Sequence, residues 1–402
     1  MMANHHEAID AFIDNLAETM IAERRYLHAH PEPSFEEFET TAFLARELDL
    51  QGIPFRTPAS RRGLIAGPEF AEGTPLIAFR GDIDALRIRD LKEVSYKSAN
   101  DGLLHGCGHD AHAVMALGAA RALWSCRERL PWPVAWRAIL QPAEEVGAGA
   151  FEMIEAGALV DVRAIVALHV DPLTPVGDVG YRAGVFTAAC SDLSVTILGK
   201  GGHAARPHQA IDPITAMAQF LSAVHATVPR EVDAREAVVV TFGSVHGGGS
   251  PNVIPDEVRL LGTVRTQSFE TADKVAEIIQ RIARGVGEST STTIEVRFEG
   301  AVGPVVNDER VTNICVQAAR ALLGEEHVHP IPLPSMGAED FAGYLRHVPG
   351  CMMRLGTANE TKPRQPLHSP YFDLDERALA IGAKLLVRSV VSLAYPGRFE
   401  SP

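Results

Sequence analysis

Residues 75–84 read Pro-Leu-Ile-Ala-Phe-Arg-Gly-Asp-Ile-Asp, a short apolar run followed directly by acidic residues. Residues 134–145 repeat this arrangement, because a largely apolar run is followed by Gln-Pro-Ala-Glu-Glu, and the apolar run 163–168 is followed by His169. A helical pattern over 109–123 separates the first two runs. Alternating strands and helices predict a mostly parallel sheet between helices, in which ligands bind beyond the carboxyl ends of the strands. We therefore expect these acids and the histidine to converge on one site.

The composition is that of an ordinary globular protein. The chain has 402 residues, of which 46% are hydrophobic and 22% are charged, so it can bury a sizeable core. Length alone predicts two or three domains. The formal net charge of −14 argues against nucleic acid and anionic membranes as partners, because both would be repelled. An anionic small molecule remains possible where a local basic residue meets it.

The sequence also predicts a cytoplasmic protein. No stretch approaches the roughly 18 apolar residues of a membrane span, and Met1–Asp10 lacks the basic and apolar segments of a signal peptide. The five cysteines are scattered and odd in number, which fits a reduced protein better than a disulfide scaffold. We expect four of them in the core and treat Cys107 separately.

The middle of the chain has a different pattern. Strands and helices follow in the order β-α-β-β-α-β, over residues 192–198, 212–228, 237–245, 258–265, 272–286 and 293–298. This order is the ferredoxin-like arrangement. Glycine and proline residues near 177–184 and 300–304 provide hinges on both sides. We therefore expect a discontinuous domain, 1–187 and 301–402, with an α+β domain inserted at 188–300.

The strongest local motif is Leu104–His112, where a cysteine, histidines and an aspartate lie between glycines that permit sharp turns. Thiolate and imidazole are metal ligands, and a helix that begins near His109 would favour a thiolate at its start. A buried structural cysteine beside surface histidines would give the same pattern. The acids and the histidine at the neighbouring strand ends favour the metal site.

Adjacent carboxylates follow the second strand. On a plain surface Glu144 and Glu145 would repel each other, whereas at a strand end they suggest divided roles. One would bind a cation, and the other would take a proton from an attacking water. A lone histidine such as His169 is more often a core residue, but its place at a strand end favours the site. His368 is unremarkable by spacing alone.

Taken together, these motifs resemble the metal-dependent aminoacylase and carboxypeptidase family. The most similar branch contains hippurate hydrolase, N-acyl-amino-acid amidohydrolase and indole-acetyl-amino-acid hydrolase. The resemblance implies a zinc-exopeptidase-like α/β domain with an inserted lid and dimerisation domain. It covers nearly the whole chain in the right order, through residues 80–86, 105–112, 141–145, 168–170, 199–213, 251–256, 337–341 and 368–375.

The resemblance implies two divalent metal ions per subunit, which could be zinc, manganese, cobalt or nickel. It implies that Cys107 bridges them, where other branches use an aspartate, and that Glu144 is the catalytic base. Asp84 would support the site from behind by orienting ligands. Asp82 stands where many relatives outside this branch have a histidine ligand, and we do not assign it as one. The remaining implied ligands are His109, Glu145, His169 and His368.

The inserted domain supplies further implied residues. The glycine-rich segment 199–207 presents His203, which would hold the scissile carbonyl oxygen as it becomes negative, often in a partner subunit's site. The residues alone favour a loop histidine without a role. Asn252 and Arg265 match residues that hold the substrate's carboxylate, and the fork of an arginine suits that group.

The sequence thus predicts a homodimer, or a dimer of dimers, that hydrolyses N-acyl-L-amino acids to a carboxylic acid and an amino acid. Alternatives with the same chemistry are a dipeptidase or carboxypeptidase and an N-acetyl-diaminopimelate deacetylase. An inactive dimeric binding protein is the non-enzymatic alternative, and the presence of Glu144 argues against it because a binder needs no base. Departures from the family's usual residues at Arg87, Gly106, Arg206 and Ala338 concern substrate selectivity.

Overall fold

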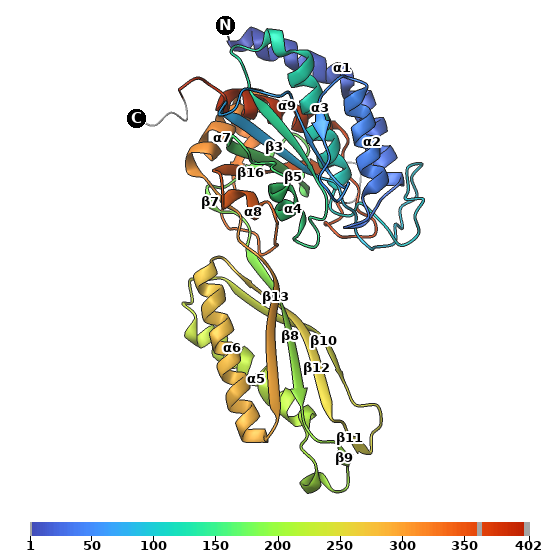
Figure 1. Ribbon diagram of the computed structural model, residues 1–402, viewed down its shortest axis with the longest axis vertical. Helices are drawn as coiled ribbons and strands as arrows, with labels where there is room; N and C mark the ends of the chain where they lie inside the picture. The colour runs from blue at the N-terminus through green and yellow to red at the C-terminus, as the bar shows by residue number, and fades with distance from the viewer. Residues whose placement is uncertain (1, 360–363, 398–402) are drawn as a thin grey trace. The chain divides into compact units, whose positions relative to one another are not determined.

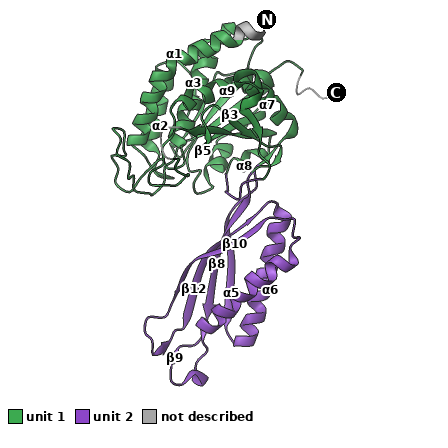
Figure 2. Ribbon diagram, turned by 180° about the vertical axis from the view of Figure 1, so that it is seen from behind, with its two compact units in different colours: residues 1–186, 306–333, 340–402 green, residues 187–305, 334–339 purple. Residues whose placement is uncertain are grey.

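The computed structural model describes residues 2–359 and 364–397, which fall into two compact units (Figure 2). Unit 1 comprises the chain up to Phe186 together with Val306–Leu333 and the chain from Asp340 onward. Unit 2 comprises Thr187–Val305 and Pro334–Glu339. The second unit therefore occupies an insertion in the first. The short segment Pro334–Glu339 groups with unit 2, although the sequence pattern placed it in the flanking domain.

Unit 1 is built on a sheet of eight strands, most of whose pairs are parallel. Strand β3 pairs in parallel with β4 and β5, β5 with β16, and β6 with β15, whereas β1/β2, β2/β4 and β6/β16 are antiparallel. This is the mixed, mostly parallel sheet predicted from the sequence. The strands lie in the order β1 (Phe55–Arg56), β2 (Leu64–Ala66), β4 (Trp136–Gln141), β3 (Leu76–Asp82), β5 (Val162–Pro175), β16 (Gly350–Ala358), β6 (Val179–Tyr181) and β15 (Val328–Pro330) (Figure 1).

Three long helices pack together and cover the central strands. They are α1 (Met2–Ala29), α3 (His109–Ser125) and α9 (Arg377–Leu393), of which α3 and α9 lie against β3 and β5. Every residue of α3 from His109 to Leu123 is buried, so the helix is enclosed on all sides rather than along one apolar stripe. Its many alanines make this possible, because small side chains let neighbouring elements approach closely.

The remaining helices of unit 1 flank the sheet. Helix α2 (Phe38–Asp49) lies beside β2 and α3, and α4 (Gly149–Glu155) packs on β4 and on α8 (Ala342–Leu345). Helix α7 (Glu309–Leu323) packs on α9 and β16. Two short strands, β7 (Gly184–Val185) and β14 (Val306–Asn307), pair where the chain leaves unit 1 and returns to it.

Unit 2 is an antiparallel sheet with helices on one face (Figure 1). Helices α5 (Pro213–Glu231) and α6 (Phe269–Thr290) cover an apolar layer that includes Leu193, Val195 and Phe220. Chain order and strand order together give the ferredoxin-like arrangement predicted from the sequence. The sheet contains β10 (Val238–Gly247), β12 (Glu257–Thr266), β8 (Ala189–Leu198) and β13 (Thr293–Val302), in that order, and a separate ribbon pairs β9 (Gly202–His203) with β11 (Val253–Ile254).

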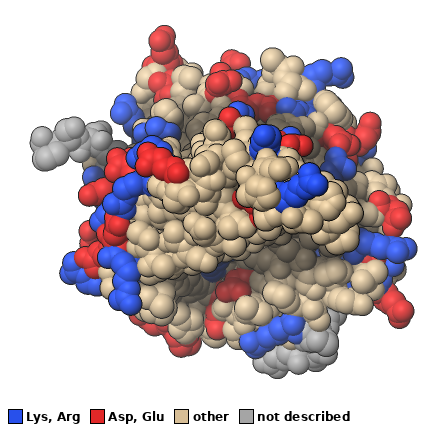
Figure 3. All heavy atoms as spheres, turned by 90° about the horizontal axis from the view of Figure 1, so that it is seen from below, with Lys and Arg blue, Asp and Glu red and all other residues tan. Residues whose placement is uncertain are grey.

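On the face drawn in Figure 3, acidic and basic side chains alternate rather than gather in one large field. Among the helices of the described residues, none is both long enough and apolar enough to cross a membrane.

A buried arginine ties three parts of unit 1 together. Arg24 of α1 is fully buried, and its guanidinium lies 2.8 Å from the Asp110 carboxylate of α3. The same group lies 3.2 Å from Asp373 and 3.5 Å from Glu376, just before α9. His28, one turn further along α1, also contacts Asp110, at 2.7 Å. This network fixes α1 and the segment before α9 against the start of α3.

We predict that Arg24→Leu lowers the free energy of unfolding by about 3–5 kcal/mol, because it leaves buried carboxylates without their counter-charge. Arg25→Leu is the matched control. The Arg25 guanidinium lies 2.6 Å from the Glu376 carboxylate, but its side chain is half-exposed. Loss of this ion pair should therefore lower the free energy of unfolding by less than about 1 kcal/mol. Urea unfolding of both variants measures the difference, and equal effects would contradict the assignment.

Candidate active site

The predicted metal ligands lie in unit 1 and meet beyond the last residues of β3 and β4. His169, which the sequence analysis placed at the end of a strand, instead lies within β5, which continues to Pro175. The ligand atoms of Cys107, His109 and His169 all lie within 4.8 Å of one another, and so do those of Cys107, Glu145 and His368. Within these groups Cys107 Sγ is 3.6 Å from His169 Nε2, and His368 Nε2 is 3.6 Å from Glu145 Oε1. The fold thus forms two groups of three possible metal donors, and both groups contain the sulfur atom of Cys107.

Close packing of α3 on β3 places the first of these groups. A side chain at Gly81 of β3 would collide with the backbone carbonyl of His112. Gly108, which precedes the helix, has φ +85° and leaves no room for a Cβ beside Val170. His368 comes from the loop before α9 and is fixed by its N–H, which donates to the Gly106 carbonyl at 2.8 Å.

The hydrogen bonds of the two buried histidines point one nitrogen of each ring into the site. His109 Nδ1 donates to the backbone and side-chain oxygens of Asp84 at 2.9 and 3.1 Å. His169 Nδ1 donates to the Val170 carbonyl at 2.8 Å. In both rings Nε2 is therefore the nitrogen left to bind a ligand. Within the described residues, His109 Nε2 and Glu145 Oε1 are buried without a hydrogen-bond partner.

The electrostatics of the site also fit divalent cations. Burial raises the pKa of the Cys107 thiol, and the Glu145 carboxylate raises it further. Burial raises the pKa of Glu145 to about 7 and lowers the pKa of His169 well below its ordinary value. A cation among these groups would favour the thiolate and the carboxylate, while His169 is already in the neutral form that a ligand requires. The residues present therefore fit a pair of metal ions.

Glu144 and Asp84 lie beside the ligand groups. The Glu144 side chain is 9% exposed, and its carboxylate is 3.8 Å from His109 Nε2. Asp84 accepts from Ser34 Oγ at 2.7 Å and from the Glu145 N–H at 3.0 Å, in addition to its bond from His109. Asp84 thus contacts the group that contains His109 through the histidine side chain, and the group that contains Glu145 through the Glu145 backbone.

The comparisons with known proteins agree with this geometry. The profile of peptidase family M20/M25/M40 matches residues 78–392. The chain belongs to this family. It is 37% identical to the N-acetyl-L-cysteine deacetylase of Bacillus subtilis over 95% of this chain and 89% of that protein. It is also 37% identical to the IAA-amino acid hydrolase ILR1-like 4 of Arabidopsis thaliana, over 91% of this chain and 83% of the relative.

A solved structure extends the match to the fold of the M20 family. The YXEP protein of Bacillus subtilis, described as a dinuclear metal binding peptidase, superposes with a TM-score of 0.80 at 34% identity. The match covers 94% of this chain and 98% of that structure. These findings confirm the family resemblance drawn from the sequence and identify the protein as a hydrolase of the M20 family.

Asp82 is bonded differently from the predicted metal ligands. Its carboxylate pairs with the buried Arg80 and accepts from His112 Nδ1 at 2.6 Å. The other nitrogen of His112 accepts from the Val170 N–H at 2.9 Å. Asp82, His109 and His112 also form a compact group, but the bonding capacity of His112 is already used. This chain of contacts instead supports the backbone next to His169.

Sequence reasoning missed His112 as a supporting residue. The signal was available, because His112 follows His109 by three residues and so lies on the same face of a helix. Its ring packs on that of His169 with centroids 4.8 Å apart. What the sequence could not show was that Asp82 would lie under the helix.

Unit 2 holds the remaining predicted residues in two places. His203 pairs with Val253 across the β9–β11 ribbon, and the Ala204 N–H donates to the Asn252 carbonyl at 3.0 Å, so His203 and Asn252 are neighbours. Arg265 lies near the other end of β12, paired with Cys190. Arg265 lies eight residues along β12 from Glu257, the first residue of that strand and the one nearest in sequence to the ribbon, which corresponds to about 27 Å of strand. Within unit 2, Asn252 is thus far from Arg265, whose guanidinium donates to the Met336 carbonyl at 2.9 Å.

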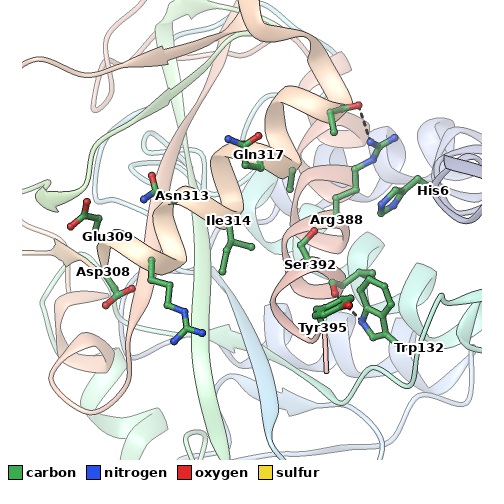
Figure 4. Close-up of a pocket in the computed structure, with 14 residues that line it drawn as sticks. His6, Trp132, Asp308, Glu309, Asn313, Ile314, Gln317, Arg388, Ser392 and Tyr395 are labelled. Atoms are coloured by element: carbon green, nitrogen blue, oxygen red, sulfur yellow. Dashed lines mark hydrogen bonds between the residues drawn. The ribbon is translucent and has the colours of Figure 1, made fainter. Parts of the chain in front are cut away.

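A separate cavity of about 870 Å³ lies between α7, α9 and the start of α1 (Figure 4). Trp132 and Tyr395 form part of its wall, with ring centroids 5.0 Å apart, and Trp132 Nε1 donates to the Val391 carbonyl. None of the predicted ligands lines this cavity.

We predict that His112→Phe, which keeps a ring of similar size, destabilises the protein in the presence of a chelator. The Asp82 carboxylate and the Val170 N–H would each lose a buried partner, at about 1–3 kcal/mol apiece. His329→Phe is the control, because His329 is 53% exposed and a change there should stay within about 0.5 kcal/mol. Thermal or urea unfolding decides between them, and equal stability of the two variants would overturn this assignment.

Proposed function

We propose that this protein is a dinuclear metal amidohydrolase that cleaves the amide bond of N-acyl-L-amino acids. The observation that carries the proposal is the pair of donor groups sharing Cys107, with Glu144 beside them. The relatives named for N-acetyl-L-cysteine and for IAA-amino acids span most of this chain, and both names describe amino acids with an acyl group. The substrate class follows from these two lines of support together.

In this proposal His109 and His169 would hold one ion and Glu145 and His368 would hold the other, and Cys107 belongs to both groups of donors. Two divalent ions would activate a water molecule and polarise the acyl carbonyl. Donors of mixed sulfur, nitrogen and oxygen type suit zinc, and manganese, cobalt or nickel are the alternatives. A reducing compartment such as the cytoplasm suits a site that needs Cys107 as a thiol.

The protein's own residues carry the proton transfers. Glu144 takes a proton from the attacking water as the water oxygen bonds to the acyl carbon. The same carboxyl then gives the proton to the amine as the carbon–nitrogen bond breaks, which leaves a carboxylic acid and a free amino acid. Asp84 orients the His109 ring and the Glu145 backbone during these steps.

The residues of unit 2 support a homodimer. We propose that His203 stabilises the developing oxyanion and that Asn252 and Arg265 hold the substrate's carboxylate. An N-acyl amino acid is far shorter than the strand that separates Asn252 from Arg265, so one copy of unit 2 cannot supply both to a single substrate. A second copy, joined through unit 2, would supply His203 and Asn252. Strand β10, which lies at the edge of its sheet, offers a surface for that pairing.

A dipeptidase is the second candidate, because the similar solved structure is described as a peptidase. A peptide bond is also an amide, so the same ligands and base would serve. Only the acyl side of the substrate differs between the two functions. A panel of N-acetyl-, benzoyl- and indole-acetyl-amino acids beside dipeptides separates them.

We predict that the protein, supplied with zinc or manganese, hydrolyses members of the N-acyl panel and that Glu144→Gln lowers kcat by about 10²–10⁴-fold. The metal content of this variant should stay at two ions per chain, because Gln replaces the base and no ligand. Elemental analysis and a turnover assay measure both quantities. Glu155→Gln, an exposed change on α4, is the control and should leave both unchanged.

Three outcomes would count against this function. Normal turnover by the Glu144→Gln variant would show that Glu144 is not the base. Activity that survives exhaustive chelation would show that the reaction needs no metal ions. Hydrolysis of dipeptides alone would replace the amidohydrolase with the peptidase.

The dimer proposal predicts complementation between two inactive variants. Glu144→Gln and His203→Ala chains are co-expressed with different tags, and the mixed dimer is purified. If His203 acts in the partner's site, one of the two sites in each mixed dimer is intact, and activity returns to about half of the wild type per dimer by symmetry. If His203 acts in its own chain, both sites carry a defect and no activity returns. A chain that sediments as a monomer while fully active would exclude the dimer.

A further inference from the structure

Glu37 is a buried carboxylate that none of the roles above uses. It stands immediately before α2, at the position that usually caps a helix, yet its side chain forms no cap there. It is fully buried, and its Oε1 instead accepts from the Ala143 N–H at 2.7 Å. Its second oxygen lies 3.7 Å from the Arg62 guanidinium, which also pairs with Glu152 at 2.9 Å.

The partner of Glu37 is an unusual residue. Ala143 has φ +52°, a left-handed conformation that is costly for a residue with a Cβ. Its carbonyl accepts from the Ala148 and Gly149 N–H groups at 3.2 and 3.0 Å, which closes the turn after β4. Ala143 directly precedes Glu144, so its backbone conformation sets the direction in which the Glu144 side chain leaves the turn.

Buried carboxylates hold the backbone on both sides of Glu144. Glu37 accepts from the N–H of Ala143, and Asp84 accepts from the N–H of Glu145 at 3.0 Å. The two carboxylates come from separate segments, one before α2 and the other after β3. They thus anchor the residues that flank the proposed base, whose carboxylate lies 3.8 Å from His109 Nε2.

We propose that Glu37 is a positioning residue that fixes the Glu144 carboxylate in its working direction by holding the Ala143 N–H. This inference rests on the proposed role of Glu144 as the base. The essential property is a hydrogen-bond acceptor at the correct reach, because Ala143 offers a neutral N–H. The negative charge serves the pairing with Arg62 and contributes to folding rather than to the direction of the base.

Three substitutions separate reach from charge. Glu37→Gln keeps an acceptor oxygen at the same reach and removes the charge. Glu37→Asp keeps the charge but withdraws the acceptor by one methylene. Glu37→Leu removes both at similar volume. Glu36→Gln is the matched control, since the neighbouring Glu36 is 59% exposed and pairs with Arg87 at the surface.

We expect kcat to fall in the order wild type, Gln, Asp, Leu, with the Gln variant within a few-fold of the wild type and the Leu variant about 10–100-fold lower, as for other supporting residues of active sites. KM and the content of two metal ions per chain should not change, because Glu37 touches neither substrate nor ligand. Steady-state kinetics on an N-acyl amino acid and elemental analysis give these values. The Glu36→Gln control should match the wild type.

The order of the Gln and Asp variants decides the proposal. If charge were the essential property, Asp would retain more activity than Gln, and this reversal would overturn the inference even if the Leu variant does not fold. Wild-type kcat in the Asp and Leu variants, or a loss that follows metal content or KM, would overturn it as well. The Glu144→Gln variant distinguishes failure of this inference from failure of the proposed function. Normal turnover by that variant would contradict the role of Glu144 as base, independently of the results for the Glu37 variants.

Discussion

The contact of helix α3 with strand β3 is the constraint on which the site depends. Gly81 brings the strand directly under the His112 carbonyl, and Gly108 lets the chain turn into the helix beside Val170. Because the two elements lie so close, the rings of His109 and His112 reach the carboxylates at the end of β3. A larger side chain at either glycine would move the helix and separate both pairs at once.

The acids and histidines of the site fall into two classes. Some have hydrogen-bond or ion-pair partners within the protein, and others keep a buried polar atom without a hydrogen-bond partner. Asp82 is paired with Arg80 and His112, and Asp84 with His109, Ser34 and the Glu145 backbone, so both are compensated within the protein. By contrast, His109 and Glu145 each keep one buried atom without a hydrogen-bond partner among the described residues. A buried polar atom of this kind is costly unless something binds it. The compensated groups therefore act as supports, and the uncompensated ones are the atoms suited to a cation.

Much of this arrangement could be predicted because its elements have local signatures. The apolar runs before Asp82, Glu144 and His169 predict buried parallel strands, and the carboxyl ends of such strands lie at one edge of the sheet. Contacts between distant segments have no such signature. Nothing in the spacing of Glu37 indicates that it meets Ala143, and periodicity cannot show that α3 is enclosed on every side. These features depend on three-dimensional packing, which a single sequence does not reveal.

The dimensions of unit 2 bear on function independently of its position. A ferredoxin-like sheet is rigid along its strands, so residues near opposite ends of β12 keep their separation however the unit moves. The proposed contacts of His203 and Asn252 thus cannot be combined with that of Arg265 by bending one chain. If all three residues contact one small substrate, as proposed, each site would need two copies of unit 2. The homodimer would then be part of the catalytic machinery, because each site would remain incomplete without the second chain.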